Sequence, residues 1–475
     1  MSFFLIRRPS WELSVHGGGV FPWELNRPAW LWHGPWFNIS APSGRIEAAN
    51  LEVDLSDLSE GARIVLDRLG EQGNAWIVGG WVRDKIAGKE KNDIDVATDL
   101  TPIDVKRLFP STIMVGEEFG TVLVRIEDTE EGEFQCEVTT LRKDGGYTDG
   151  RRPDNVTFGS EIEEDLARRD FTINAMAIEP IGRLVGGERQ YGKLIDVNDD
   201  GVNDLQTGVL RTVGNAEERI GEDGLRIIRA FRFLDLGEAG LREFDPSLGS
   251  AISSNLEMLR KVSKERIWSE LQRILSCSNS MEIVELMEEH GIFKEILPGF
   301  SVNTNADHSE DYMVNLALMC SYDESGGPEM SDKITDLLRL SGKERIILSS
   351  LHECRKIDLN PSIESVRRFS ATKSEGDKIR ILKYMQGLGT DTSYFESQLD
   401  QNSHLKAGSG PLLDGVRISE ITGLEGGKRL GRLKDWLHRI QVERDLANEE
   451  EVISILGSLD WKNSDFEGWQ RLSWP

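Results

Sequence analysis

Two acidic residues separated by a single residue, Asp93 and Asp95, are the first candidates for chemistry in this sequence. On a β-strand, side chains two positions apart point to the same face, so the two carboxylates would lie side by side. Carboxylates held that close repel each other unless a cation lies between them, and Mg²⁺ with oxygen ligands relieves the repulsion. Such pairs hold metals in phosphoryl and nucleotidyl transfer. The alternative is a pair that only caps the next element.

A glycine pair, Gly79 and Gly80, lies upstream, between an apolar run and a helical segment. Backbone N–H groups at the start of a helix can face a phosphate. Arg83 lies on the first turn of that helix, where a cation is unfavourable for the helix dipole unless an anion is near. A lone glycine pair is more often a tight turn. Its combination with Asp93 and Asp95 therefore carries the argument for a phosphate site.

A third group of charged residues lies on the helical segment 222–233. Asp223, Arg226 and Arg229 are spaced three apart and are therefore expected on one helix face. A carboxylate acceptor next to a guanidinium donor can imitate the hydrogen-bonding edge of a nucleobase. The protein itself could then act as the template that selects a base. The alternative is a salt-bridged helix face, because Asp and Arg commonly pair at this spacing.

Three further charged motifs have two interpretations each. Arg169 and Asp170 either contact a nucleotide or belong to a surface ion cluster. Glu137, on a strand next to the aspartate pair, is either a third carboxylate near the metal or a charge on an edge strand. Arg151 and Arg152 lie in a polar loop that either clamps a triphosphate or is simply solvated.

Together these motifs resemble those of the class II nucleotidyltransferases, which comprise CCA-adding tRNA nucleotidyltransferases and bacterial poly(A) polymerases. Three segments are similar to family motifs in the family's order: GGWVRDKIAGKEKNDIDVAT (79–98), RRDFTINAMA (168–177) and EDGLRIIRAFRF (222–233). YTDGRRPDNVTFGS, DLQTGVLRTVGN and VSKERIWSEL are further matches. The resemblance runs from about residue 58 to 290 and, more loosely, to the end of the chain.

The resemblance implies a role for each candidate residue. Asp93 and Asp95 would be the catalytic ligands of Mg²⁺, with Glu137 as a candidate third ligand. Asp223 and Arg226 would select CTP and ATP over UTP and GTP. Contacts of Arg169 and Asp170 would favour ribose over deoxyribose. The full set of implied nucleotide-binding residues is Gly79, Gly80, Arg83, Arg169, Asp170, Asp223, Arg226, Arg229 and Arg232.

The implied activity is addition of CCA to the 3′ end of tRNA from CTP and ATP, by two-metal nucleotidyl transfer without a nucleic-acid template. The partners would be tRNA, CTP and ATP, with no membrane, and the oligomeric state stays open. A poly(A) polymerase, or an enzyme that adds only CC or only A, would share these motifs. A catalytically silent RNA-binding protein on the same scaffold is an alternative of another class. The hinge segment IDVNDDGVNDL (195–205) departs from the family pattern, which usually has a glycine pair there.

The elements that position these residues are predicted from hydrophobic periodicity and capping signals. Beyond about residue 215, apolar residues recur every three or four positions, which predicts an all-helical region. The fold class is α+β: a mixed α/β head, polymerase beta-like by resemblance, followed by a helical neck, body and tail. In the head, helices are predicted at 58–73, 81–88 and 101–109, and strands at 75–80, 93–100, 120–128 and 134–142.

A chain of 475 residues exceeds one hydrophobic core, so several domains are expected. The net charge of −26 disfavours general affinity for a polyanion, so RNA binding must rest on local basic clusters. The proposed divisions are an unassigned N-terminal extension (1–50), the nucleotidyltransferase head (51–190), a base-recognising neck (191–275), a helical body (276–370) and a tRNA-binding helical tail (371–475).

Four cysteines without a C-x-x-C pair disfavour a zinc ribbon and a disulfide framework, and they fit a reducing compartment. No stretch approaches the roughly 20 apolar residues needed to cross a bilayer. The extension 1–50 has five tryptophans and several acidic residues, a poor fit to an organellar transit peptide. A cytoplasmic location is therefore expected.

Overall fold

The computed structural model describes most of the chain from residue 51 onward. The Trp-rich extension 1–50 and the loop that contains Arg151 and Arg152 lie outside the described residues, so the predictions for them stay untested. The described ranges are 51–89, 93–115, 120–129, 132–145, 155–159, 161–186, 190–360, 362–402, 405–408 and 410–475.

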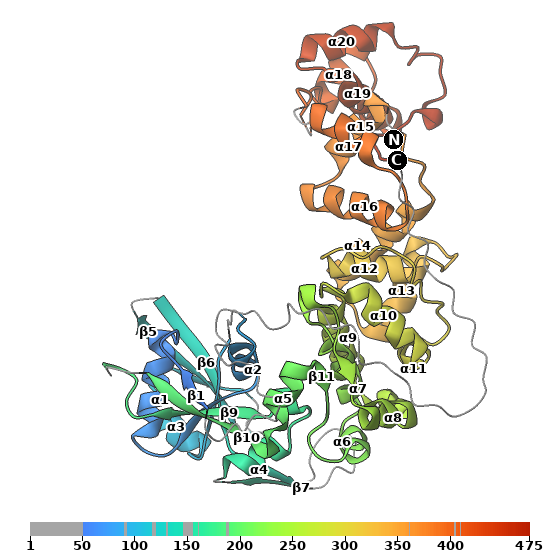
Figure 1. The fold of residues 1–475 in the computed structure, drawn as a ribbon. Coiled ribbons are helices and arrows are strands. Elements are labelled where there is room, and N and C mark those ends of the chain that lie inside the picture. The colour runs from blue at the N-terminus through green and yellow to red at the C-terminus, as the bar shows by residue number, and fades with distance from the viewer. Residues whose placement is uncertain are drawn as a thin grey trace, which may run out of the picture. The chain divides into compact units, whose positions relative to one another are not determined.

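An eight-stranded mixed sheet forms the first part of the described chain (Figure 1). Its strand order is β1-β10-β9-β2-β3-β6-β5-β4, and within it β3 and β6 pair in parallel while the other neighbours are antiparallel. The strands are β1 (Glu52–Asp54), β2 (Ala75–Val78), β3 (Asp95–Thr98), β4 (Thr112–Met114), β5 (Thr121–Thr129), β6 (Gly132–Thr140), β9 (Met176–Ile181) and β10 (Tyr191–Asp196). A separate pair consists of β7 (Arg142–Gly145) and β8 (Asn155–Phe158).

Helices cover both faces of the sheet because its central strands are apolar on both sides. Ile77 and Val96 share a core with α1 and α3 on one face. Trp76 and Ala97 share a second core with α4 on the other. Because side chains alternate along a strand, Asp95 lies on the face of Ala97, away from α1 and α3. The helices of this part are α1 (Glu60–Gly70), α2 (Gly80–Ile86), α3 (Pro102–Leu108), α4 (Ile162–Ala167) and α5 (Asp200–Thr207).

A side chain caps the start of two of these helices. The start of α3 is the predicted one, whereas α1 begins at Glu60, two residues after the predicted start. The Ser59 hydroxyl accepts from the N–H of Ala62 at the start of α1. Thr101 accepts from the N–H of Asp104 at the start of α3, and Pro102 occupies the first helical position. Both caps satisfy backbone donors that the helix leaves free.

The remaining elements are helical except for two two-residue strands. The helices are α6 (Ala216–Glu222), α7 (Leu225–Arg232), α8 (Pro246–Ser254), α9 (Lys264–Leu275), α10 (Ser280–Glu289), α11 (Ile292–Ile296), α12 (Tyr312–Met319), α13 (Gly327–Leu338), α14 (Gly342–Glu353), α15 (Ile363–Thr372), α16 (Glu375–Gly387), α17 (Ser393–Gln401), α18 (Gly415–Thr422), α19 (Lys428–Arg444) and α20 (Glu449–Ser458). β12 (Glu243–Phe244) pairs in parallel with β11 (Val209–Leu210). Two residues are too few to show alternation, so the sequence missed this strand.

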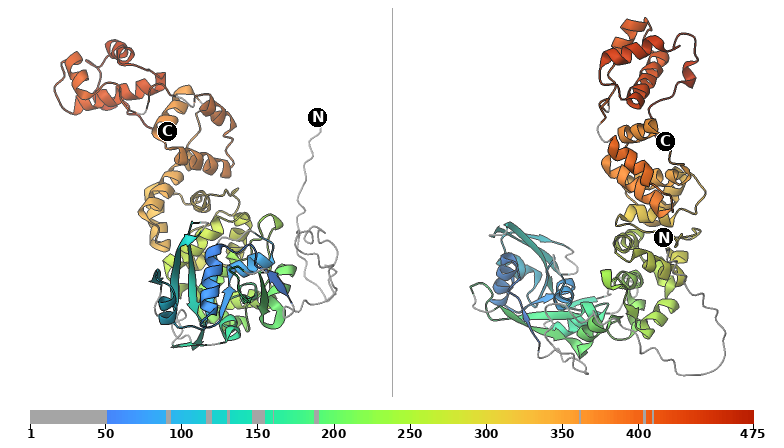
Figure 2. Two further views of the ribbon diagram at one scale, coloured as in Figure 1. Left: turned by 90° about the vertical axis from the view of Figure 1, so that its left-hand side faces the viewer. Right: turned by 45° about the horizontal axis from the view of Figure 1, so that its top comes forward.

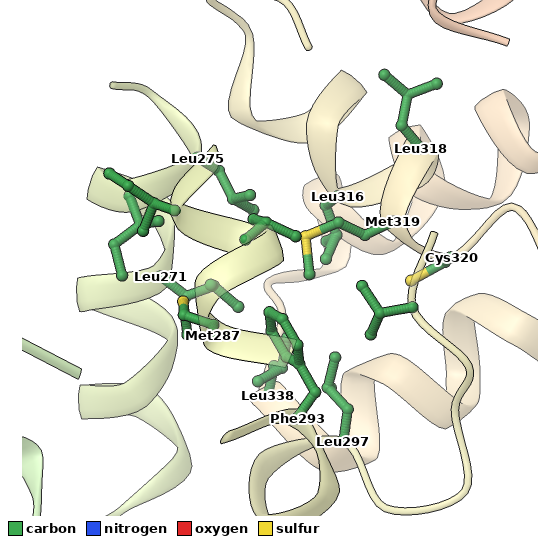
Figure 3. Close-up of a cluster of buried hydrophobic side chains, with 14 of the residues drawn as sticks. Leu271, Leu275, Met287, Phe293, Leu297, Leu316, Leu318, Met319, Cys320 and Leu338 are labelled. Atoms are coloured by element: carbon green, nitrogen blue, oxygen red, sulfur yellow. The ribbon is translucent and has the colours of Figure 1, made fainter. Parts of the chain in front are cut away.

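One hydrophobic core connects the helices from α7 to α17. Figure 3 shows part of it, where Leu271 and Leu275 of α9 lie near Met287 of α10 and Phe293 of α11. The helices α18 to α20 have a separate core, in which Trp469 stacks on Trp436 at 5.2 Å between ring centroids. Figure 2 gives two further views of these helices.

All four cysteines, Cys136, Cys277, Cys320 and Cys354, are free thiols in the structure. Among the described residues, no helix is both long and apolar enough to span a membrane.

Candidate active site

A cavity of about 680 Å³ is formed by the sheet together with α7 and α9. Its volume is in the range of small-molecule sites. It brings together every predicted site residue except Asp93, which is not among its lining residues. Eight arginines and five carboxylates line it: Arg83, Arg168, Arg169, Arg226, Arg229, Arg232, Arg266 and Arg273, with Asp95, Glu137, Asp165, Asp170 and Asp223.

The acidic side of the cavity is built on two neighbouring strands. Asp95 of β3 and Glu137 of β6 are direct partners in the parallel register. Because β6 lies inside the sheet, the alternative of an edge-strand charge at Glu137 is wrong. Burial raises the pKa of the Asp95 carboxyl, and the negative charges of Glu137 and Asp93 add to this effect while Arg169 opposes it. Asp95 is thus a carboxylate whose like-charged neighbours are only partly offset.

The turn between β2 and α2 approaches this carboxylate closely. Gly79 has φ 76° and ψ −139°, a conformation that only glycine adopts without strain. A Cβ atom at Gly79 would lie 3.3 Å from Oδ2 of Asp95 and 3.6 Å from Nη1 of Arg169. Gly80 then begins α2. The glycine pair therefore lets the backbone pass between the acidic and basic sides of the cavity.

Arg83 has a carboxylate next to it in the chain. Its Nε and Nη2 donate to the two carboxylate oxygens of Asp84 at 2.8 and 3.0 Å. Its Nη1 donates to Oδ1 of Asn174 at 2.8 Å. The anion that the sequence analysis required near this cation is therefore at least partly Asp84, and the guanidinium is held in place at the cavity wall.

The RRDF motif (168–171) is an ordered part of the wall, so the alternative of a surface ion cluster is wrong. Asp165 is buried and accepts from Nε of Arg168 at 3.0 Å and from Nη2 of Arg169 at 3.1 Å. Burial acts to raise the pKa of Asp165, but the two arginines outweigh it and hold the pKa below the ordinary value. Asp165 thus fixes both arginines in the cavity wall, with Arg169 near Asp95.

Asp170 is occupied by protein contacts. Its carboxylate accepts from the N–H of Phe171 at 2.9 Å and from Nε of Arg229 at 2.7 Å. Arg229 also lies 3.5 Å from Oε1 of the buried Glu270, and Nε of Arg232 lies 2.7 Å from Oε2 of the same residue. Burial, with the charge of Arg229, lowers the pKa of Arg232 to about 10. The contact of Asp170 with ribose stays a prediction; what the structure shows is that it holds Arg229.

The predicted base-reading residues come together in the cavity, but not as one helix face. Asp223 lies between α6 and α7 with an extended backbone, φ −149° and ψ 109°. Its carboxylate accepts from Nη2 of Arg266 at 2.6 Å and from the N–H of Leu225 at 3.0 Å. Arg226 is bound by Glu222, one helical turn earlier. Both the single helix face and the Asp223–Arg226 salt bridge are therefore wrong.

Several residues of the site were missed from the sequence. Arg266 lies in VSKERIWSEL, which matched the family without an assigned role. Asp165 and Glu270 are acidic residues on helices, where they resemble ordinary solvated charges. Phe233 has the guanidinium carbons of Arg83, Arg229 and Arg232 within 5.4, 5.2 and 4.2 Å of its ring centroid. Only tertiary contacts identify these residues.

The arrangement suits a nucleoside triphosphate. Arginines can bind phosphate groups, and carboxylates with partly offset charge can hold a hard cation beside them. Asp223 presents acceptor oxygens and Arg226 presents guanidinium donors to the same cavity, the pairing that base recognition uses. Among the residues that the structure describes, no three acidic, histidine or cysteine side chains converge as a ready metal site.

Family comparisons agree with this geometry. Residues 75–211 match the family model "Poly A polymerase head domain". Residues 243–303 match a second model, "Probable RNA and SrmB- binding site of polymerase A".

Two curated relatives show how far the similarity extends. The CCA-adding enzyme of Bacillus licheniformis is 39% identical over 416 residues, which cover 84% of this chain and 98% of the relative. The CCA-adding enzyme of Lactobacillus johnsonii is 38% identical over 248 residues, which cover 52% of this chain and 57% of the relative. With this second relative, the match spans little more than half of the relative's length.

A solved structure supports the same fold. The Bacillus stearothermophilus CCA-adding enzyme in complex with CTP superposes with a TM-score of 0.68 at 25% identity. The alignment covers 84% of this chain and 97% of that structure. The aligned part of this chain includes the mixed α/β head and the helices that follow it.

Proposed function

This chain belongs to the nucleotidyltransferase family of CCA-adding enzymes, and on that premise we propose that it adds C, C and A to the 3′ end of tRNA from CTP and ATP. The observation that carries the proposal is that one cavity brings together Asp95 and the pair Asp223 and Arg226. The eight arginines that line this cavity, which we call the arginine wall, surround the same space. The 3′-hydroxyl of the RNA attacks the α-phosphate, and pyrophosphate leaves as the new bond forms.

Mg²⁺ is the cofactor that the family implies, and the residues present fit it. Asp93 and Asp95 would hold it, with Glu137 beside them. Burial and neighbouring negative charges raise the pKa of Asp95, and a bound cation would lower it again by stabilising the carboxylate. When bound, Mg²⁺ neutralises charge on the phosphates and can act as a two-metal pair. Gly80 and Arg83 orient the triphosphate, while Arg169, anchored by Asp165, positions the nucleotide next to Asp95.

Base selection would need no nucleic-acid template. Asp223 offers acceptor oxygens and Arg226 offers donors, and each is anchored by a different residue, Arg266 and Glu222. Cytosine and adenine both present an amino donor next to a ring-nitrogen acceptor, whereas uracil and guanine present a carbonyl at the same place. An acceptor and donor pair fixed in this way would accept CTP and ATP and exclude UTP and GTP.

We propose the divisions predicted above, with the head extended from 190 to 196 because β10 (Tyr191–Asp196) pairs with β9 in the main sheet. The neck would then contain α7 and α9, and the tail would bind tRNA. Four free thiols fit a reducing compartment, so we propose a cytoplasmic location.

The test is a product analysis with the full chain. Purified protein is incubated with Mg²⁺, CTP, ATP and tRNA transcripts that end before the first C, after CC and after CCA, and the products are sequenced. Addition that stops at CCA supports the proposal, whereas long A tails or a halt at CC would select a poly(A) polymerase or a CC-adding enzyme. No extension at all would select the silent scaffold. An Asp95→Ala variant with wild-type incorporation would contradict the assigned site.

A further inference from the structure

A second, smaller pocket adjoins the active-site cavity. Its volume is about 190 Å³, and we call it the Lys89 pocket. It shares Arg83, Arg232 and Phe233 with the larger cavity, so these residues form the wall between the two. Its remaining lining residues are Asp84, Ala87, Lys89, Asp235 and Arg242.

Two of the four cations in this pocket already have a carboxylate partner. Arg83 is paired with Asp84 at 2.8 Å, and Arg232 with Glu270 at 2.7 Å. Within the described part of the chain, neither Lys89 nor Arg242 forms an ion pair. The carboxylate of Asp235 also lines the pocket, where it accepts from Nδ2 of Asn279 and forms no ion pair in the described structure. Lys89, Arg242 and Asp235 together therefore leave one net positive charge in the pocket.

Arg242 is the more unusual of the two because it is buried, with 7% of its surface exposed. Its Nη1 donates to the carbonyl oxygens of Phe233 at 2.6 Å and Asp235 at 3.3 Å. Its buried Nε has no acceptor among the described residues. Burial and the charge of Arg83 lower the pKa of Arg242 to about 10. A buried cation without a carboxylate is costly unless a ligand supplies the negative charge.

Lys89 supplies the second cation from the solvent side, since its side chain is exposed. Burial of part of the side chain, together with the charge of Arg242, lowers the pKa of Lys89. Arg242 thus disfavours the charged form of Lys89, an effect that the carboxylates of Asp84 and Asp235 oppose. An anion between Lys89 and Arg242 would remove this repulsion.

Size and charge favour a single phosphate group as the ligand. A volume of 190 Å³ is below the range for a whole nucleotide, and the adjoining cavity of 680 Å³ already has room for one. The one net positive charge left by Lys89, Arg242 and Asp235 fits the single charge of a phosphodiester better than the higher charge of pyrophosphate. The shared wall makes the pocket continuous with the place where the RNA 3′ end must lie if the proposed function is correct.

We propose that the Lys89 pocket binds a backbone phosphate of the RNA strand near its 3′ end, held by Lys89 and Arg242. This inference rests on the proposed function and adds an RNA-positioning site to it. Lys89 and Arg242 are positioning residues: they place the attacking strand and do not contact the reacting atoms.

The test compares Lys89→Ala with Lys85→Ala in the full chain, using steady-state incorporation of the first C into a tRNA transcript. Lys85 lies on the adjacent helix α2 but pairs with Asp57 at 2.7 Å and does not line the pocket. Lys89→Ala should raise the KM for RNA roughly fivefold and make this KM less dependent on salt concentration. The KM for CTP should be unchanged. Lys85→Ala should leave both KM values near wild type.

A transcript with a neutral methylphosphonate in place of a single 3′-proximal phosphodiester gives a second readout. Scanning this replacement over the last three linkages should raise the KM of the wild type at one linkage, and Lys89→Ala should be insensitive there. Arg242→Lys, which keeps the charge, should give a smaller effect than Lys89→Ala.

The possible failures are distinguishable. A rise in the KM for CTP alone would assign the pocket to the incoming nucleotide, and altered product inhibition by pyrophosphate alone would assign it to the leaving group. Either result, or unchanged kinetics, would overturn the proposal. Continued incorporation at saturating RNA in each of these cases would leave the proposed function standing.

Discussion

The carboxylate of Asp223 is held by Arg266, with Nη2 and Oδ2 2.6 Å apart, and not by Arg226 three residues downstream. Arg266 comes from α9, a different helix from those on either side of Asp223. The second oxygen of Asp223 accepts from the N–H of Leu225. The direction of this carboxylate is therefore set by tertiary packing and by the turn that precedes α7.

Arg266→Ala should impair base selection. Without the guanidinium, the Asp223 carboxylate loses its side-chain donor and can turn away from the incoming base. We expect kcat/KM for CTP and ATP to fall about tenfold or more, and discrimination against UTP to fall as well. Single-nucleotide incorporation with each of the four triphosphates measures both effects. Arg260→Ala, which removes an exposed arginine paired with Glu295, is the control and should leave selection unchanged. Loss of stability with intact discrimination would contradict the positioning role.

Gly79→Ala should reduce activity and stability together. The backbone conformation, with φ 76°, disfavours any side chain, and the new Cβ would lie 3.3 Å from Oδ2 of Asp95. We expect a loss of about 1 to 3 kcal/mol in the free energy of unfolding, measured by urea denaturation. Gly70→Ala is the matched control, because a Cβ there meets nothing within 4 Å. It should be neutral or slightly stabilising. Equal effects at the two glycines would rule out the special role of Gly79.

Glu270→Gln should destabilise the protein. The buried carboxylate lies 2.7 Å from Arg232 and 3.5 Å from Arg229. Its loss removes the carboxylate partner of Arg232, while Arg229 keeps Asp170. We expect the free energy of unfolding to fall by about 3 kcal/mol. Glu329→Gln, at an exposed pair with Lys333, should cause no measurable change. A Glu270 variant as stable as the wild type would show that the arginines find other partners.

Asp196 should make stability depend on pH. Burial raises the pKa of its carboxyl from 3.8 to about 6, against the opposing effect of hydrogen bonds from the N–H groups of Val202 and Gly201. Because the folded state then binds the proton more tightly than the unfolded chain, the free energy of unfolding should fall as pH rises from about 4 to about 6 and then level off.

Asp196→Asn keeps an oxygen acceptor for the start of α5 but cannot titrate. Urea denaturation of both proteins between pH 4 and 7 should show a decrease in the wild type that is larger by about 1 to 2 kcal/mol. Parallel pH profiles would mean that Asp196 titrates normally in the folded protein.

The sequence by itself determined the local elements of the site. Apolar runs and periodicity predicted β2, α2 and β3, because strand and helix periods depend only on neighbouring residues. The common face of Asp93 and Asp95 stays a prediction, because β3 begins at Asp95 and Asp93 precedes it. The motif order also identified the family. Where a motif crossed an element boundary, local periodicity misled: Asp223 was assigned to a helix that begins only at Leu225.

The tertiary structure decided which charges meet. Asp170 binds Arg229, 59 residues away, and Asp223 binds Arg266, 43 residues away. In a chain with 56 basic and 82 acidic residues, attraction between opposite charges cannot select these partners from sequence spacing. The packing of α7 and α9 fixes the distances, and burial removes the competing water, so only the folded protein specifies how the arginine wall is held.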